Sequence, residues 1–269
     1  MRKCGKKLAG IALCLAFLTG CGTGQAATGP RTDKEETITE QNTEETTQET
    51  TQETASKEEP EETESQSKPD GTTLTYIGHA AVKIVAKDGS VLYVDPYYSE
   101  GDYSDKADVL LITHGHSDHQ PSASFQAKDT CEKITYKEAL VNGEYKSFES
   151  GPFSIQAVAA GGNSNHNINV CVGYLITVDG ITIYHAGDTS MIDQMKELSD
   201  KKIDYAMYPI DGEYNMDAAE ATEVANLVGA KHNIPIHEFN GTNERKQDNF
   251  LPEGRLELQY GETIELSDE

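Results

Sequence analysis

The amino-acid sequence predicts an α/β protein in which two mixed β-sheets are stacked and helices lie outside them. Three observations favour this fold class. Strand-like segments come in two groups along the chain, a helix-like segment follows each group, and turn residues such as Gly, Asp and Pro separate the segments. Amphipathic layers of this kind bury their apolar faces by packing sheet on sheet, with helices covering the outer faces.

The first group of strands leads into a cluster of histidines. Three strands forming an antiparallel meander are predicted at residues 74–77, 81–85 and 91–96, the last of them ended by Pro96. Asp88-Gly89 is a typical hairpin turn before the third of them. The apolar, β-branched run at 107–113 predicts a buried strand that delivers the histidines. Residues 132–141 fit either a helix or a strand.

The second group contains a hairpin and ends in closing strands. Asp179-Gly180 closes a predicted hairpin of residues 170–178 and 181–185, and two short strands surround Gly151-Pro152 within 148–160. The remaining segments are a short helix at 191–198, a strand at 203–210, a helix at 217–228, a strand at 234–237 and two closing strands within 255–266. Asp217 is placed to cap its helix, with Glu220 three residues later completing a capping box.

The N-terminus has the features of an export signal. A basic start is followed by an apolar run, and Leu18-Thr19-Gly20-Cys21 resembles a bacterial lipoprotein box. The resemblance implies that residues 1–20 are a signal peptide, cleaved before Cys21, and that acyl chains such as palmitate anchor Cys21 to the extracytoplasmic face of the cell membrane. An ordinary signal peptide with an incidental Cys21 is the alternative.

Residues 21–71 are predicted to be a disordered tether rich in Thr, Glu and Gln. Residues 31–70 contain fourteen acidic and four basic residues, a net charge of −10, and almost nothing to bury. Charge repulsion would extend such a segment, which would hold the following domain away from the membrane.

Residues 72–269 are long enough for one folded domain. They carry 32 acidic and 14 basic residues, a net charge of −18, which argues against a nucleic-acid partner. Cys131 and Cys171 lie in this part of the chain and could form a disulfide or stay free.

One short motif concentrates groups that bind metals. His114, His116, Asp118 and His119 fall within six positions, and the chain has only eight histidines. Imidazole and carboxylate together suit Zn²⁺, Fe²⁺ or Mn²⁺. A polar surface turn with incidental histidines is the alternative, but three histidines and an Asp at this spacing favour a metal site.

Further polar residues follow other predicted strands. Asp95, Asp188 and His237 each stand where a strand ends, so all could converge on the histidine motif at one edge of the sheets. Taken singly, each could equally be an ordinary turn residue.

The order of these motifs resembles the metallo-β-lactamase superfamily, and within it the branch of lactonase-like metal-dependent hydrolases. The resemblance covers residues 72–269 and rests on Tyr76-Ile77-Gly78-His79, Val94-Asp95-Pro96, the motif at 114–119, Tyr184-His185-Ala186-Gly187-Asp188-Thr189, Tyr208-Pro209-Ile210 and Pro235-Ile236-His237. It implies an αββα sandwich with a metal site at one edge.

The same resemblance implies two divalent metal ions, with zinc expected and Mn²⁺ or Fe²⁺ as alternatives. The first would be bound by His114, His116, a third histidine and a bridging Asp188, and the second by Asp118, His119, Asp188 and His237. The third histidine departs from the family's pattern, and His166 in a Gly/Asn-rich loop is the nearest candidate. Without His166, a single metal in the second site becomes the expected state.

Three other residues are placed around these ligands. Asp95 matches an acid that holds a ligand loop by hydrogen bonds. His79 and His185 stand beside family motifs without matching a ligand position, so they either support or line the site, or are structural.

The implied activity is metal-dependent hydrolysis of a small molecule. A hydroxide held by the metals would attack an ester, lactone, phosphodiester or amide, with Asp118 orienting it and relaying a proton. A non-catalytic metal-binding envelope lipoprotein that kept the fold is the alternative.

Overall fold

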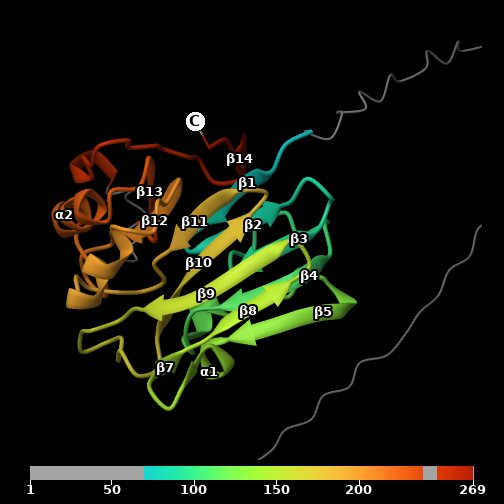
Figure 1. The fold of residues 1–269 in the computed structure, drawn as a ribbon, viewed down its shortest axis with the longest axis horizontal. Helices are drawn as coiled ribbons and strands as arrows, with labels where there is room; N and C mark the ends of the chain where they lie inside the picture. Colours follow the sequence, from blue (N-terminus) through green and yellow to red (C-terminus); the bar gives the residue numbers. More distant parts are fainter. Residues whose placement is uncertain (1–69, 239–246, 269) are drawn as a thin grey trace, which may run out of the picture. The chain divides into compact units, whose positions relative to one another are not determined.

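The computed structural model describes residues 70–238 and 247–268 (Figure 1). The expected signal peptide and all but the last two residues of the expected tether lie outside these residues. No helix in the described part of the chain is both long and apolar enough to cross a membrane.

The first sheet has six strands in the order β14-β1-β2-β3-β4-β5. Its strands are β1 (Thr73–Gly78), β2 (Ala81–Val85), β3 (Val91–Val94), β4 (Ala107–Ile112), β5 (Ala127–Thr135) and β14 (Glu262–Glu265). The pairs from β14 to β3 are antiparallel, which confirms the predicted meander, and β3-β4 and β4-β5 are parallel. The sheet is therefore mixed.

The second sheet also has six strands, in the order β13-β12-β11-β10-β9-β8. Its strands are β8 (Ser147–Ser150), β9 (Phe153–Ala159), β10 (Val172–Val178), β11 (Ile181–His185), β12 (Tyr205–Pro209) and β13 (His232–Ile236). The β10-β11 hairpin turns at Asp179 (φ 52°) and Gly180 (φ 87°), as type I′ geometry requires. Parallel pairing of β11, β12 and β13 makes this sheet mixed as well.

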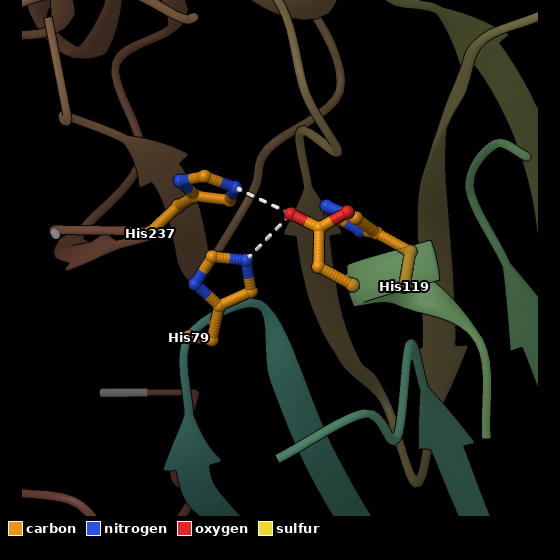
Figure 2. Close-up of side chains that lie close together, drawn as sticks. His79, His119 and His237 are labelled. Atoms are coloured by element: carbon orange, nitrogen blue, oxygen red, sulfur yellow. Dashed lines mark hydrogen bonds and ion pairs between the residues drawn. The ribbon is translucent and has the colours of Figure 1, made fainter. Parts of the chain in front are cut away.

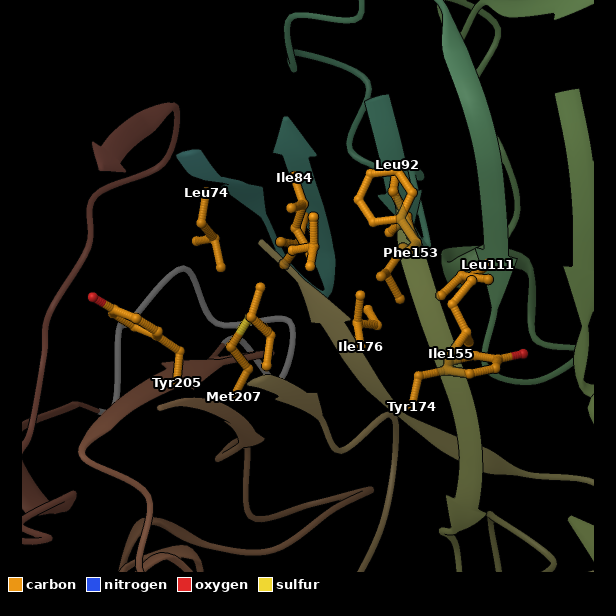
Figure 3. Packing of buried hydrophobic residues seen from close by; sticks show 14 of the residues in the cluster. Leu74, Ile84, Leu92, Leu111, Phe153, Ile155, Tyr174, Ile176, Tyr205 and Met207 are labelled. Atoms are coloured by element: carbon orange, nitrogen blue, oxygen red, sulfur yellow. The ribbon is translucent and has the colours of Figure 1, made fainter. Parts of the chain in front are cut away.

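The apolar core lies between the two sheets. Alternate residues of the first sheet, such as Leu74, Ile84 and Leu111, pack against Tyr174 and Ile176 of the second (Figure 3). Because side chains alternate across a strand, the intervening residues form separate clusters on the outer faces.

The outer faces are covered unequally. α2 (Ala218–Val228) and the 3₁₀ helix η2 (Asp193–Leu198) cover the second sheet. The outer cluster of the first sheet is instead packed by Tyr103 and Phe125 from loops. The predicted stack of two mixed sheets is confirmed, but the described helical cover is concentrated on one side.

The remaining helices and strands are short. The segment that fitted either state contains both, because β5 is followed by α1 (Tyr136–Ala139) and by β6 (Leu140–Val141), which pairs with β7 (Glu144–Tyr145). Two further 3₁₀ helices are η1 (Ser117–His119) and η3 (Gln247–Asn249).

Two sequence predictions were wrong in detail. Residues 255–266 contain one strand, β14; the chain before it pairs only briefly with β13, where Asn233 N donates to Gly254 O and Leu256 N to Asn233 O, both at 2.8 Å. Asp217 caps α2 as expected, but Glu220 does not complete a capping box, because its carboxylate accepts a hydrogen bond from Met191 N at 3.0 Å. The two cysteines of the domain, Cys131 and Cys171, are both free thiols.

Candidate metal centre

The site lies where strands of both sheets end. β4 runs into the loop that carries His114 to His119, β11 ends just before Asp188, and β13 ends just before His237. His79, Asp95 and His237 have left-handed backbone conformations, with φ of 56°, 44° and 49°. Non-glycine residues rarely adopt this conformation, and such strain concentrates at functional sites.

Asp188 stands at the centre of the site and is buried. Its carboxylate oxygens lie 3.1 Å from His166 Nε2, 3.3 Å from His119 Nε2, 3.4 Å from His237 Nε2 and 4.0 Å from His114 Nε2. Burial opposes ionisation of this carboxyl, but the neighbouring His119 and His237 outweigh it and hold its pKa well below the usual range. Asp188 is therefore a buried carboxylate surrounded by imidazoles.

The potential ligands form three groups. In each group, every residue has one donor atom that lies within 4.8 Å of the donor atoms of the other members. The groups are His114, His116 and His166; His114, His119 and Asp188; and His79, Asp118, His119 and His237 (Figure 2). The structure thus brings His166, the least certain of the predicted ligands, together with His114 and His116.

Oxygen atoms lie next to the Nδ1 atoms of four histidines. His119 Nδ1 donates to Asp95 Oδ2 at 2.7 Å, and His166 Nδ1 donates to the Tyr214 carbonyl at 3.2 Å. His237 Nδ1 lies 3.1 Å from Asp211 Oδ2. Such partners favour a proton on Nδ1, so Nε2 is the nitrogen that faces the metal position. Burial opposes protonation of His119 and His237, but the contacts with Asp188 outweigh it and raise the pKa of His119 well above its usual value and that of His237 to about 9. A bound metal would replace the Nε2 proton of these two rings.

His114 has the same arrangement through Thr113. The Thr113 hydroxyl donates its one proton to Asp95 Oδ2 at 2.6 Å, so it accepts at 3.1 Å from His114 Nδ1. Burial, together with the adjacent His119, lowers the pKa of His114 to about 3. His114 is therefore neutral, the form in which imidazole binds metals.

Unpaired buried atoms test whether this arrangement fits a metal. Among the described residues, His114 Nε2, His119 Nε2, His237 Nε2 and Asp188 Oδ1 are buried without a hydrogen-bond partner. An unpaired buried polar atom costs about 1–3 kcal/mol, and four around one point are a large penalty unless something binds them. A divalent cation suits nitrogen and carboxylate donors of this kind.

Asp95 contacts the loop that carries His114 to His119. Its buried carboxylate also accepts from Thr113 N at 2.9 Å, so it fixes both the start of the loop and the ring of His119. Burial opposes ionisation of Asp95, and the contact with His119 more than compensates and lowers its pKa.

Asp211 has the same relation to His237, and sequence reasoning missed it. Its Oδ1 accepts from the backbone N–H groups of Glu213 at 2.8 Å and Tyr214 at 2.7 Å, while Oδ2 faces His237. Burial raises the pKa of Asp211, but the contact with His237 outweighs this effect and lowers the pKa to about 2. Asp211 follows the strand at 203–210, so the rule that polar residues at strand ends gather at the site would have found it.

His185 and His79, for which the sequence allowed either a role in the site or a structural role, have different environments. His185 Nε2 donates to Ala80 O at 2.9 Å and its Nδ1 accepts from Gly187 N at 3.1 Å, so both ring nitrogens are occupied and the residue is structural. His79 Nε2 instead lies 3.2 Å from Asp118 Oδ2, within the group of potential ligands.

A cavity of about 410 Å³ opens beside these groups. It is lined by His116, Asp118, Ser164, Asn165, His166, Asp188, Tyr214 and His237. A small molecule in this cavity would contact Asp118 and Asp188 directly.

Comparison with known proteins identifies the family. A family model described as "Beta-lactamase superfamily domain" matches residues 73–237. The chain belongs to the metallo-β-lactamase superfamily. A UPF0173 metal-dependent hydrolase from Geobacillus thermodenitrificans is 32% identical over 226 residues, covering 72% of this chain and 99% of that protein. A relative of the same description from Pyrococcus furiosus is 30% identical over 189 residues, covering 61% of this chain and 83% of that protein.

Solved structures agree with this assignment of the superfamily. A protein from Parabacteroides distasonis, provisionally described as a metal-dependent hydrolase, shares 29% identity with a TM-score of 0.57, covering 70% of this chain and 94% of that one. A metallo hydrolase from Ignicoccus hospitalis, 24% identical, shows the same fold with a TM-score of 0.59, covering 73% of this chain and 98% of that one. The predicted fold and enzyme class, a metal-dependent hydrolase, are confirmed at the level of the superfamily.

Proposed function

We propose that this superfamily member hydrolyses a small ester, lactone, phosphodiester or amide with two divalent metal ions, zinc being expected and Mn²⁺ or Fe²⁺ the alternatives. One observation carries the proposal: an oxygen atom lies within 3.2 Å of Nδ1 in His114, His119, His166 and His237, and the Nε2 atoms of all four face Asp188. Four imidazole Nε2 atoms directed at one carboxylate form an arrangement that is suited to binding cations.

The donor groups divide between two ions. His114, His116 and His166 would bind the first, and Asp118, His119 and His237 the second, with Asp188 shared between them. Bound metals would polarise the substrate oxygen and lower the pKa of water from 15.7 towards about 7.

Asp118 is the candidate catalytic residue. It is the carboxylate of the site with the greatest access to solvent, with 39% of its side chain exposed against 3% for Asp188, and it lines the cavity. Contacts with His237 and then His79 lower its pKa, so it is ionised at neutral pH. An ionised Asp118 can accept a hydrogen bond from the attacking water, orient it and pass its proton onward.

Metal analysis and a substrate panel test the proposal together. The purified full chain should contain about two equivalents of metal and hydrolyse at least one of a small ester, a lactone, a phosphodiester and an amide. Asp118→Ala should lose about 10²–10⁴-fold in kcat, as expected for loss of a group that handles the proton. The control Asp193→Ala changes an exposed carboxylate of η2 that pairs with Lys196, and it should behave as the wild type.

A folded, metal-loaded wild type that turns over none of the four substrate classes would contradict the hydrolase. It would favour the non-catalytic metal-binding alternative.

We also propose that the enzyme is a lipoprotein anchored by Cys21 to the extracytoplasmic face of the cell membrane, with residues 21–71 as the tether. The proposal is supported by the basic, apolar and Leu18-Thr19-Gly20-Cys21 segments in their expected order. Two or three acyl chains would provide the anchor, since each buried CH₂ contributes about 0.8 kcal/mol.

Cell fractionation tests the anchor. The wild type should sediment with membranes, incorporate labelled palmitate and be released by detergent, whereas Cys21→Ser should do none of these. Equal membrane association of the wild type and Cys21→Ser would contradict the lipid anchor.

A further inference from the structure

His79 lies in a hairpin turn, and its side chain belongs to a group of potential metal ligands. It lies in the turn between β1 and β2, where the register of the two strands shifts after Tyr76. Its backbone is in the left-handed region, with φ of 56°, which non-glycine residues seldom adopt. The carbonyl of His79 accepts hydrogen bonds from His237 N at 2.8 Å and from the Tyr76 hydroxyl at 3.0 Å. These bonds fix the turn with the imidazole directed into the site (Figure 2).

The distances from His79 Nε2 to neighbouring donor atoms are similar to those between two ligand atoms of one metal ion. His79 Nε2 is 3.2 Å from Asp118 Oδ2, and His237 Nε2 is 3.8 Å from the same oxygen. Tetrahedral coordination with bonds of about 2.0–2.1 Å separates ligand atoms by about 3.3–3.4 Å. Donor atoms of His79, Asp118, His119 and His237 all lie within 4.8 Å of one another. The set contains three imidazoles and one carboxylate, a donor combination that suits zinc.

The ring of His79 also packs with the other histidines of this group. Its centroid is 3.8 Å from that of His237 and 5.7 Å from that of His119. By contrast, His185 has both ring nitrogens bonded to the backbone and cannot coordinate. His79 shares its unusual backbone conformation with Asp95 and His237, which also belong to the site.

We propose that His79 is a further protein ligand of the metal bound by Asp118, His119 and His237, in addition to the Asp188 that the two metals would share. This inference rests on the proposed function, because it concerns the same metal centre. The alternative role for His79 is to orient Asp118 by a hydrogen bond without touching the metal. The two roles differ in the number of imidazoles on the ion, which can be measured.

Cobalt(II) substitution of the full chain provides the test. Proton NMR of the Co²⁺ protein shows one strongly shifted, exchangeable N–H signal for each coordinated imidazole that keeps a proton on its other nitrogen. His79→Asn should lose one such signal, whereas the signal count would not change if His79 only oriented Asp118. In either role, one of the two Co²⁺ ions should bind about 10–100-fold more weakly. Asn tolerates the left-handed backbone, so the turn is preserved. The matched control His232→Asn alters a histidine that stacks on Tyr205, and it should change neither quantity.

A rescue experiment separates coordination from folding. His79→Gly suits the left-handed backbone and removes the ring, so added imidazole should restore the lost Co²⁺ affinity. An unchanged count of shifted signals in His79→Asn, with no response of His79→Gly to imidazole, would overturn the inference and leave the proposed function intact. A wild type that binds no Co²⁺ would overturn both.

Discussion

Buried carboxylate–histidine pairs are the units from which the site is built. Asp95 holds His119 and also accepts from Thr113 N at the start of the histidine loop, whereas Asp211 faces His237 and accepts from N–H groups of its own loop. A buried ion pair adds little by itself to stability, but removing one partner leaves an uncompensated charge. These pairs therefore act mainly by fixing the orientation of the imidazole rings.

The Asp211 pair can be tested by a single isosteric change. Asp211→Asn keeps an oxygen for the N–H groups of the loop but removes the charge that His237 Nδ1 faces. We expect about a 10–100-fold loss of affinity for one metal, the effect typical of a group that orients a ligand. Competition with a chromophoric chelator measures it.

The control for this change is Asp193→Asn, which alters an exposed carboxylate of η2 and should leave both affinities unchanged. Equal affinities in Asp211→Asn and the wild type would show that Asp211 serves only its own loop.

His185 gives the opposite expectation. Because its two ring nitrogens bind Ala80 O and Gly187 N, His185→Gln should retain the full metal content. The free energy of unfolding should fall by about 1–3 kcal/mol, since buried partners lose a hydrogen bond. Urea denaturation and metal analysis of the same sample check both points, and loss of one metal equivalent would assign His185 a direct role instead.

At the scale of elements, the loop after β9 brings His166 to the other histidines of the site. Gly161 (φ 92°) and Gly162 (φ 89°) turn the chain back on itself, and Asn163 Oδ1 accepts from His166 N at 2.8 Å. This compact turn places His166 over Asp188. A loop of Gly and Asn is therefore an ordered support for His166 here.

Gly161→Ala tests the turn. A Cβ at this position would lie 2.7 Å from the His166 carbonyl oxygen, so the loop must move and carry His166 away. We expect loss of one metal equivalent, measured by inductively coupled plasma mass spectrometry.

Gly180→Ala is the matched control for the turn. Gly180 has a similar φ of 87°, but a Cβ there would meet nothing within 4 Å. It should lower stability without changing metal content. If both variants keep two metals, His166 is not a required ligand.

At the scale of the whole domain, the site joins the two sheets. His114, His116 and His119 follow β4 of the first sheet, whereas His166, Asp188 and His237 follow strands of the second. Metals bound by both sets would crosslink the layers of the sandwich. They would also satisfy the buried Nε2 and carboxylate oxygen atoms that now lack partners.

Chelation tests this crosslink. Free metal at about 100 times its Kd stabilises the folded state by about 2.7 kcal/mol per ion. Removing the metals with a chelator should therefore lower Tm by roughly 5–10 °C for each ion, and Zn²⁺ should restore it. Differential scanning calorimetry measures the change, and a Tm indifferent to chelator and zinc would contradict a structural contribution of the ions.

The amino-acid sequence alone predicted the features that short-range chemistry controls. Asp179-Gly180 specified its hairpin because few residues accept positive φ, and alternating or continuous apolar runs specified the strands. The cluster from His114 to His119 was recognisable because its donors are neighbours along the chain. By contrast, residues 255–266 were assigned one strand too many, because their pairing depends on a distant partner, Asn233.

Only the tertiary structure decided how the remaining groups meet. His185 bonds a carbonyl 105 residues away, His166 bonds one 48 residues away, and His79 lies beside a carboxylate 39 residues away. Such contacts depend on strand order and register across two sheets, for which no local pattern exists. The same residue type is therefore structural at His185 and placed to coordinate at His79, because packing, not composition, determines which ring nitrogen stays free.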